Sequence, residues 1–202
     1  MKYKCITGGP ISENCYLLID EKTNQAAVVD PGFLNDALLN EIKKYTVQRI
    51  LLTHGHFDHI WEADRLHEML GVPVCAYETE AAFAADDKQN GSLLMMYESV
   101  TCKVHEAFKD GETFQIGEVP VTVLHTPGHT AGGVSYITPD AVFTGDTLMG
   151  YSVGRCDLPT GNSAELRESL KKLAALPGNP DICGGHGPVT TLEDEKRRNP
   201  YL

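Results

Sequence analysis

The sequence predicts an α/β fold in which two β-sheets pack face to face and helices cover their outer faces. The first observation is that strand-like apolar segments are followed by helical patterns in both halves of the chain. The second is size, because 202 residues of which 42% are hydrophobic can bury a substantial core. The third is that no linker-like or low-complexity segment divides the chain. We therefore expect a single domain over residues 1–202.

The first half begins with a predicted pair of strands at residues 15–19 and 26–29. The helix expected next is marked by apolar residues at helical spacing: Leu34, Leu38, Ile42 and Tyr45. Residues 49–53 are predicted to form a strand, and a second helix is expected from about Asp58 to Gly71. The apolar face of this second helix consists of Ile60, Ala63, Leu66 and Leu70.

The rest of the chain repeats this plan. Further strands are predicted at residues 72–76, 113–116, 119–124, 134–137 and 141–143. The alanine-rich stretch 78–96 is expected to hold a helix, which Asn90-Gly91 breaks or ends. The last predicted helix begins at a cap formed by Asn162 and Glu165.

Four side chains that can bind a metal lie within six residues: His54, His56, Asp58 and His59. Because they follow the strand predicted at 49–53, they are expected to lie in a strand-to-helix turn. Neutral imidazole and carboxylate groups suit zinc, iron and manganese. The cluster therefore predicts a metal site, and two adjacent ions would need more ligands than a single turn can supply.

Three further donors each follow a short apolar run: His129 in Pro-Gly-His-Thr, Asp146 in Gly-Asp-Thr and His186 in Gly-His-Gly. Taken singly, each could equally be an ordinary hydrogen-bonded polar residue. Taken with the first cluster, they complete seven donors. These divide into three histidines around one ion and Asp58 with two histidines around the other, and one carboxylate is able to bridge.

The ordered motifs His-x-His-x-Asp-His, Pro-Gly-His-Thr, Gly-Asp-Thr and Gly-His-Gly resemble those of the metallo-β-lactamase-fold hydrolases, from Asn14 to the end of the chain. The resemblance implies a four-layer αββα sandwich with metals along one edge of the sheets. It assigns the first metal to His54, His56 and His129, and the second metal to Asp58, His59 and His186. It also implies that Asp146 bridges the two. Asp30 follows the family's early strand, and we do not expect it to be a ligand.

Residues 154–161 and 185–202 look like the short glyoxalase II-like branch of this family. Glyoxalase II hydrolyses S-acylglutathione thioesters such as S-lactoylglutathione, so the resemblance implies a thioesterase with two divalent ions, expected to be zinc, with iron or manganese as alternatives. A metal-bound hydroxide would attack the thioester carbonyl. Asp58 would orient that hydroxide or take its proton.

The substrate contact that the resemblance suggests is Arg155, which falls where the family carries a basic substrate-binding residue. Its guanidinium could pair with a substrate carboxylate or form a structural ion pair. Glyoxalase II proper continues into a separate carboxyl-terminal helical domain, which we do not expect in this chain. A thioester is therefore implied more directly than glutathione as its thiol.

Alternative functions stay open at this stage. An iron-dependent persulfide dioxygenase would hold a single iron with two histidines and an aspartate, matching His54, His129 and Asp146. A hydrolase of another ester or lactone, or a non-catalytic metal-binding module, could carry the same motifs. A true β-lactamase is less favoured, because such enzymes need an extracytoplasmic address and no signal peptide is recognisable.

The formal net charge of −11 argues against nucleic acid as a partner, since phosphates require clustered positive charge. The basic run Lys196-Arg197-Arg198 follows acidic residues, so it is either a solvated, charge-balanced tail or a group of cations near the mouth of the site. The six cysteines show no disulfide or zinc-knuckle spacing and are expected to be buried thiols. We expect a cytoplasmic protein that acts on a small molecule and has no membrane segment.

Overall fold

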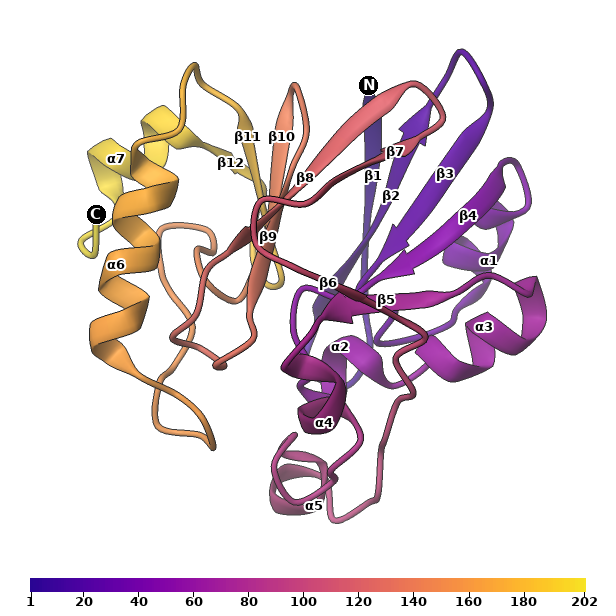
Figure 1. Ribbon diagram of the computed structural model, residues 1–202, viewed down its shortest axis with the longest axis horizontal. Coiled ribbons are helices and arrows are strands. Elements are labelled where there is room, and N and C mark those ends of the chain that lie inside the picture. The colour runs from indigo at the N-terminus through magenta and orange to yellow at the C-terminus, as the bar shows by residue number, and fades with distance from the viewer.

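The computed structural model describes residues 1–202 and contains two six-stranded mixed sheets (Figure 1). The first sheet follows chain order: β1 (Lys2–Gly8), β2 (Glu13–Asp20), β3 (Gln25–Val29), β4 (Thr46–Leu51), β5 (Val74–Tyr77) and β6 (Glu106–Phe108). The second sheet has the order β12-β11-β10-β9-β8-β7. Its strands are β7 (Thr113–Ile116), β8 (Val119–His125), β9 (Val134–Ile137), β10 (Ala141–Gly145), β11 (Asp181–Gly184) and β12 (Thr190–Thr191).

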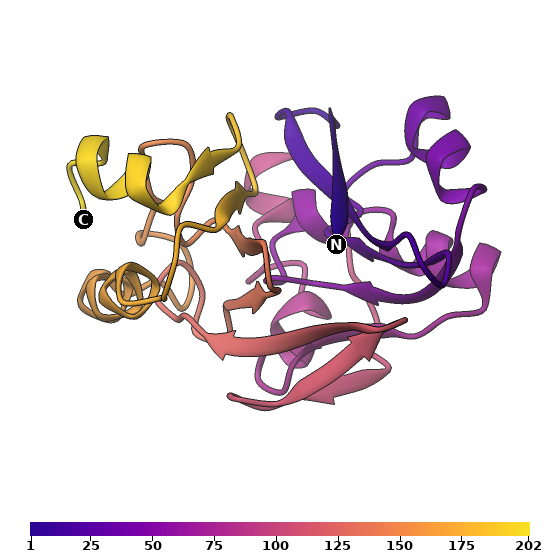
Figure 2. The ribbon, with the colours of Figure 1, turned by 90° about the horizontal axis from the view of Figure 1, so that it is seen from above.

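Helices cover the outer faces of both sheets, as Figures 1 and 2 show. The helices on the side of the first sheet are α1 (Asp36–Ile42), α2 (Phe57–Ile60), α3 (Ala63–Leu70), α4 (Glu80–Ala84) and α5 (Ser92–Met95). Those on the side of the second sheet are α6 (Ser163–Ala174) and α7 (Leu192–Arg198). The predicted four-layer αββα sandwich is confirmed.

Three apolar layers hold the sandwich together. In β2, Leu17 and Ile19 face the helices, whereas Tyr16 and Leu18 face the second sheet. This alternation arises because successive side chains of a strand point to opposite faces of the sheet. Each fully buried aliphatic side chain of this kind contributes about 1.5–3 kcal/mol. A third layer lies between the second sheet and the helices α6 and α7.

The helix predicted from Asp58 to Gly71 is divided in two, so the expectation of one continuous helix was wrong. The break comes after α2, where the backbone N–H of Glu62 donates to the carbonyl of Pro31 rather than continuing the helix. The same loop packs tightly on α2, since a Cβ on Gly32 would lie 1.5 Å from the carbonyl oxygen of Asp58. Gly71 ends the second helix in the left-handed conformation, as expected.

The stretch 78–96 also contains two short helices, and the predicted break falls at Asn90-Gly91 between them. The buried Asn90 amide donates to the carbonyls of Ala84 and Val100, and its oxygen accepts from the N–H of Ser92. Gly91 has a φ of 85°, which favours glycine. The side chain of Asn90 therefore ties the loop together where the backbone leaves the helix.

The basic run near the end of the chain belongs to α7, which the sequence did not predict. Acidic residues occupy its first turn and basic residues its last turn, the arrangement favoured by the helix dipole. Arg197 pairs with Asp194 on the same helix, and the Arg198 guanidinium lies 4.4 Å from the centre of the Tyr151 ring. The charge-balanced interpretation of this run therefore agrees with its contacts.

The cysteines only partly match the expectation of buried thiols. Cys15, Cys75, Cys102 and Cys183 are buried, whereas Cys5 is exposed and Cys156 is partly exposed. All six are free thiols. No helix is both long and apolar enough to cross a membrane.

Candidate metal centre

The seven predicted donors meet at one edge of the two sheets, because each follows the carboxyl end of a strand. The turn after β4 supplies four of them: His54, His56, Asp58 and His59. His129 lies in the loop after β8, and Asp146 and His186 follow the parallel neighbours β10 and β11. The ends of β10 and β11 are held in register by a hydrogen bond from the N–H of Gly185 to the carbonyl of Gly145.

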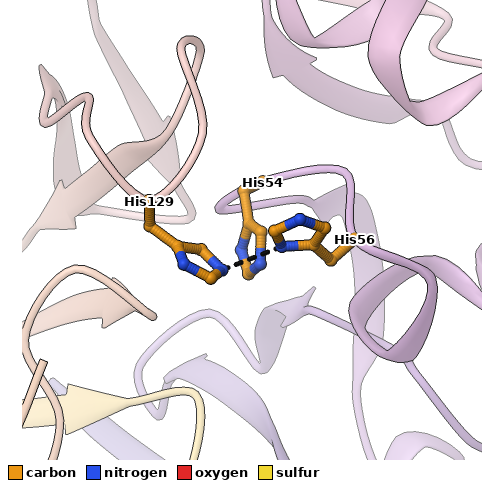
Figure 3. A group of neighbouring side chains, drawn as sticks. All are labelled: His54, His56 and His129. Carbon is orange, nitrogen blue, oxygen red and sulfur yellow. Dashed lines mark hydrogen bonds between the residues drawn. The ribbon is translucent and has the colours of Figure 1, made fainter. Parts of the chain in front are cut away.

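A first group is formed by three buried histidines, His54, His56 and His129, drawn in Figure 3. One ring nitrogen from each lies within 4.8 Å of the others. His56 Nδ1 and His129 Nε2 are 2.8 Å apart. Three imidazoles at this spacing are suited to hold one metal ion.

A second group consists of Asp58, His59 and His186. The carboxylate oxygen Oδ2 of Asp58 lies 3.1 Å from His186 Nε2 and 3.3 Å from His59 Nε2. A carboxylate and two imidazoles form a second donor set suited to a divalent ion.

Asp146 lies between the two groups. Its Oδ2 is 3.5 Å from Nε2 of His129 in the first group, and its Oδ1 is 3.4 Å from Nε2 of His59 in the second. One carboxylate can therefore offer an oxygen to each group, the arrangement expected of a bridging ligand.

The outer nitrogens of His54, His129 and His186 have hydrogen-bond partners that fix the rings. His54 Nδ1 is 3.1 Å from Thr53 Oγ1, and His129 Nδ1 is 2.7 Å from the carbonyl oxygen of Arg155. His186 Nδ1 is 3.3 Å from the carbonyl oxygen of Ser12. Such outer partners orient an imidazole and leave its other nitrogen for a metal.

Asp30 is the partner of His59, and the sequence did not indicate this role. Its Oδ2 lies 3.0 Å from His59 Nδ1 and accepts a hydrogen bond from Thr53 Oγ1, while its Oδ1 accepts from the backbone N–H of Thr53. Asp30 also lies within 4.8 Å of His54 and His59 in a third group of possible donors. Because both of its oxygens already accept hydrogen bonds, we interpret it as an orienting residue. The signal in the sequence was an aspartate at a strand end, in Val-Val-Asp-Pro-Gly.

Three inward-facing atoms have no hydrogen-bond partner although they are buried: Nε2 of His54, Nε2 of His59 and Oδ1 of Asp146. Buried polar atoms are nearly always satisfied, so unpartnered ones call for an explanation. Divalent metal ions would satisfy these nitrogens and this oxygen at once. The side chains of the site therefore fit divalent metal ions.

Burial and the neighbouring imidazoles favour the neutral form of His54 and His56 in the first group. Burial lowers the pKa of His56 to about 3, with a further contribution from His129. The pKa of His54 is also lowered well below its ordinary value, mainly by burial and by His59. Neutral imidazole is the form that binds a metal.

In the second group, nearby carboxylates favour the protonated form of the histidines. Burial by itself would lower the pKa of His59, but the charges of Asp58 and Asp146 outweigh it and raise that pKa well above the ordinary value. The pKa of His186 is raised as well, because Asp58 and Asp146 outweigh the effect of burial. The histidines in turn hold the pKa of Asp58 below its usual range, against the effect of burial.

A second acidic residue that the sequence did not indicate is Glu80, which is 2% exposed. Its Oε1 accepts a hydrogen bond from the backbone N–H of Gly55, between the first two histidines. Burial raises the pKa of Glu80, although hydrogen bonds from Thr130, Gly55 and Gly132 oppose that rise. Glu80 therefore holds the histidine loop in place from the side of α4.

The site opens to solvent through a cavity of about 180 Å³, here called the metal cavity. Its walls include ligand candidates from both groups, among them His56, Asp58, His129 and His186. The remaining walls are largely apolar: Ile11, Phe57, Met95, Met149 and Leu158.

Arg155 also lines the metal cavity, and its guanidinium pairs with Asp157 through two hydrogen bonds of 2.6 and 2.7 Å. The hydrogen bonds to Asp157 raise the pKa of the Arg155 guanidinium. The structure thus shows the ion pair, and the contact of Arg155 with a substrate stays a prediction.

The chain is similar to known proteins over nearly its whole length. The chain is 38% identical to the probable metallo-hydrolase YqgX of Bacillus subtilis over 208 residues, which cover 100% of this chain and 98% of the relative. It is 31% identical to the hydroxyacylglutathione hydrolase GloC of Haemophilus influenzae, with coverage of 100% and 98%.

Two solved structures are similar as well. The B3 metallo-beta-lactamase BLEG-1 has a TM-score of 0.93 and 34% identity, with coverage of 100% of this chain and 99% of the other. TTHA1623, solved in a di-iron-bound form, has a TM-score of 0.84 and 34% identity, with coverage of 98% and 100%. The family model of the metallo-beta-lactamase superfamily matches residues 8–186, and the chain belongs to that superfamily.

Proposed function

We propose that this protein is a hydrolase with two divalent metal ions, acting on S-acylglutathione thioesters such as S-lactoylglutathione. The observation that carries the proposal is the position of Asp146, with one oxygen toward His129 and the other toward His59. A carboxylate shared by two complete donor groups supports a dinuclear site. In this proposal His54, His56 and His129 hold one ion, Asp58, His59 and His186 hold the other, and Asp146 bridges them.

When bound, two such ions supply Lewis acidity that makes a hydroxide available near neutral pH and stabilises negative charge on a carbonyl oxygen. The protein's own side chains orient the metal ligands and shape the cavity in which the substrate reacts. The outer partners Thr53, Asp30 and the Arg155 carbonyl fix the ring orientations. The apolar walls of the metal cavity exclude water from the rest of the substrate.

Asp58 is the catalytic side chain in this proposal, because its carboxylate both faces the second group and lines the metal cavity. His59 and His186 keep its pKa below the usual range despite burial, so the carboxylate is ionised at neutral pH. An ionised carboxylate of low basicity is a better hydrogen-bond acceptor than proton acceptor. We therefore assign Asp58 the role of orienting the attacking water, rather than that of a general base.

The choice of thioester is supported by the relative named as a hydroxyacylglutathione hydrolase, which is 31% identical over its nearly complete length. Arg155 at the wall of the metal cavity supplies a cation for an anionic substrate. The net charge of −11 favours a small molecule over nucleic acid as the partner.

The test is turnover of S-D-lactoylglutathione by the purified protein loaded separately with zinc and with iron. His59→Ala should abolish turnover, because it removes a ligand of the second ion, while His105→Ala, an exposed histidine outside both groups, should retain it. A fully loaded protein that leaves the thioester intact would contradict the proposal.

Hydrolysis of β-lactams is a second candidate, favoured by the 34% identity to BLEG-1. Comparing nitrocefin and the thioester on the same loaded protein separates the two hydrolytic activities. The persulfide dioxygenase alternative requires one iron, held by His54, His129 and Asp146. Elemental analysis distinguishes it, because hydrolysis predicts two ions per chain and oxygen chemistry predicts a single iron.

A further inference from the structure

A second, larger hollow lies beside the metal cavity, and we propose that it receives the carboxylate-bearing thiol arm of the thioester, with Arg167 as the residue that selects for that carboxylate. This inference rests on the proposed thioesterase function and adds a substrate-binding groove to it. The hollow, here called the α6 groove, has a volume of about 630 Å³. It is bordered by α6, by residues 153–156 and by the carboxyl-terminal Pro200 and Tyr201.

The α6 groove adjoins the metal cavity. Gly154 and Arg155 line both hollows, so this short segment forms their common wall. The wall packs against the outer side of two ligand candidates, since a Cβ on Gly154 would lie 2.2 Å from the carbonyl oxygen of Asp146 and 2.7 Å from His129 Nδ1. In this proposal a substrate whose carbonyl lies at the metals crosses the 154–155 segment to place its thiol arm in the groove.

The groove has a charge opposite to that of the protein as a whole. Its walls include two arginines, Arg155 and Arg167, and no aspartate or glutamate, in a chain with a formal net charge of −11. Arg155 is already paired with Asp157. Arg167 makes no ion pair, and its Nε donates only to the carbonyl of Ser163, 3.2 Å away. The terminal nitrogens of this guanidinium thus remain available for a carboxylate.

The floor of the groove is apolar. Leu166 and Leu170, from the same helix as Arg167, are 5% and 2% exposed, and Val153 packs against their cluster. Tyr201 adds an aromatic side chain that is 58% exposed. An apolar floor beside a cation fits an extended organic chain that ends in a carboxylate. Figure 1 shows α6 and the carboxyl terminus on the same side of the molecule, beyond the second sheet.

Two parts of the substrate are thereby separated in space. The acyl group and the scissile bond would occupy the metal cavity, whose walls beyond the ligand candidates are mostly apolar. The thiol arm would lie in the α6 groove with its carboxylate at Arg167. The groove lies outside the metal ligands, so its effect should be on substrate binding and not on the chemical step.

The experiment compares S-D-lactoylglutathione with its diamide, in which both carboxylates are carboxamides, on the zinc-loaded and iron-loaded protein. Arg167→Gln should raise KM for the carboxylate substrate roughly tenfold, because a hydrogen bond to a charged group is lost, and should leave kcat within about twofold. KM for the diamide should not change. Arg167→Lys should restore part of the affinity, since it keeps the positive charge.

Arg65→Gln is the matched control, because Arg65 is an exposed arginine of α3 whose side chain pairs with Glu62. It should leave KM for both substrates unchanged. If Arg167→Gln raises KM for both substrates equally, or for neither, the selection by Arg167 is wrong while the thioesterase proposal stands. If the wild-type protein hydrolyses neither substrate, the thioesterase proposal fails and this assignment of the groove fails with it.

Discussion

The two donor groups contain similar ligands but lie in different electrostatic surroundings. In the first group, the outer nitrogens of His54 and His129 contact a hydroxyl and a backbone carbonyl, both neutral. In the second group, His59 has carboxylates on both sides, with Asp30 at Nδ1 and Asp58 and Asp146 at Nε2. The difference determines which protons each group holds before a metal binds.

The first group is prepared for a metal, because burial favours the neutral form of His54 and His56 and the inward-facing Nε2 of His54 has no partner. In the second group, a protonated His59 already forms ion pairs with the carboxylates of Asp30 and Asp58 before any metal binds. A metal entering the first group gains new interactions at once. A metal entering the second group must first displace protons.

Asp146 couples the two groups, so its removal should give the largest effect. We predict that Asp146→Ala lowers turnover roughly 10³-fold, more than the 10–100-fold typical for partners that only orient a ligand. Both ions lose a ligand, so metal content should fall below two per chain by elemental analysis. Asp140→Ala, at an exposed aspartate in the bend before β10, is the control and should bind two ions. A variant at Asp146 that keeps two tightly held ions would show that the groups bind independently.

A substitution at Asp30 should weaken metal binding by the second group without affecting the first. We predict that Asp30→Asn lowers the affinity for the second ion roughly 10–100-fold, because the anion that orients His59 becomes a neutral amide. Asparagine tolerates the left-handed backbone of this position, where φ is 50°. The first ion should stay bound, which metal titration followed by calorimetry can resolve into two steps. Asp64→Asn on α3 is the matched control, and equal weakening of both steps would refute the separate role of Asp30.

The donors could be predicted from the sequence because each lies in a short local motif. A histidine cluster after a strand, or a Gly-Asp-Thr turn, indicates a ligand without knowledge of the rest of the fold. The positions of most strands were likewise predictable, since apolar runs and turn residues mark them locally, whereas β1, β6 and β12 were not predicted. The αββα architecture followed from the alternation of such elements.

What the sequence did not predict depends on contacts between distant segments. Asp30 reaches His59 because β3 pairs in parallel with β4, which places Val29 beside Leu51. The helix break before α3 arises where Glu62 donates to the carbonyl of Pro31, 31 residues earlier in the chain. The α6 groove needs Tyr201 to lie near residues of the 153–156 segment. Strand register and loop packing of this kind have no local signal.

Lowering the pH should release the second ion before the first, and this effect should be smaller and more gradual than those of the substitutions. Burial lowers the pKa of His56 to about 3 and that of His54 well below the ordinary value, so protons do not compete for these two imidazoles between pH 7 and pH 5. The raised pKa values of His59 and His186 mean that protons compete for the second group throughout that range. For each proton that a metal must displace, affinity should fall about tenfold per pH unit as the pH drops. Equilibrium dialysis against buffered zinc from pH 7 to pH 5, followed by elemental analysis, should therefore show a fall from two ions to one. Loss of both ions in a single step would mean that the two electrostatic surroundings do not act separately.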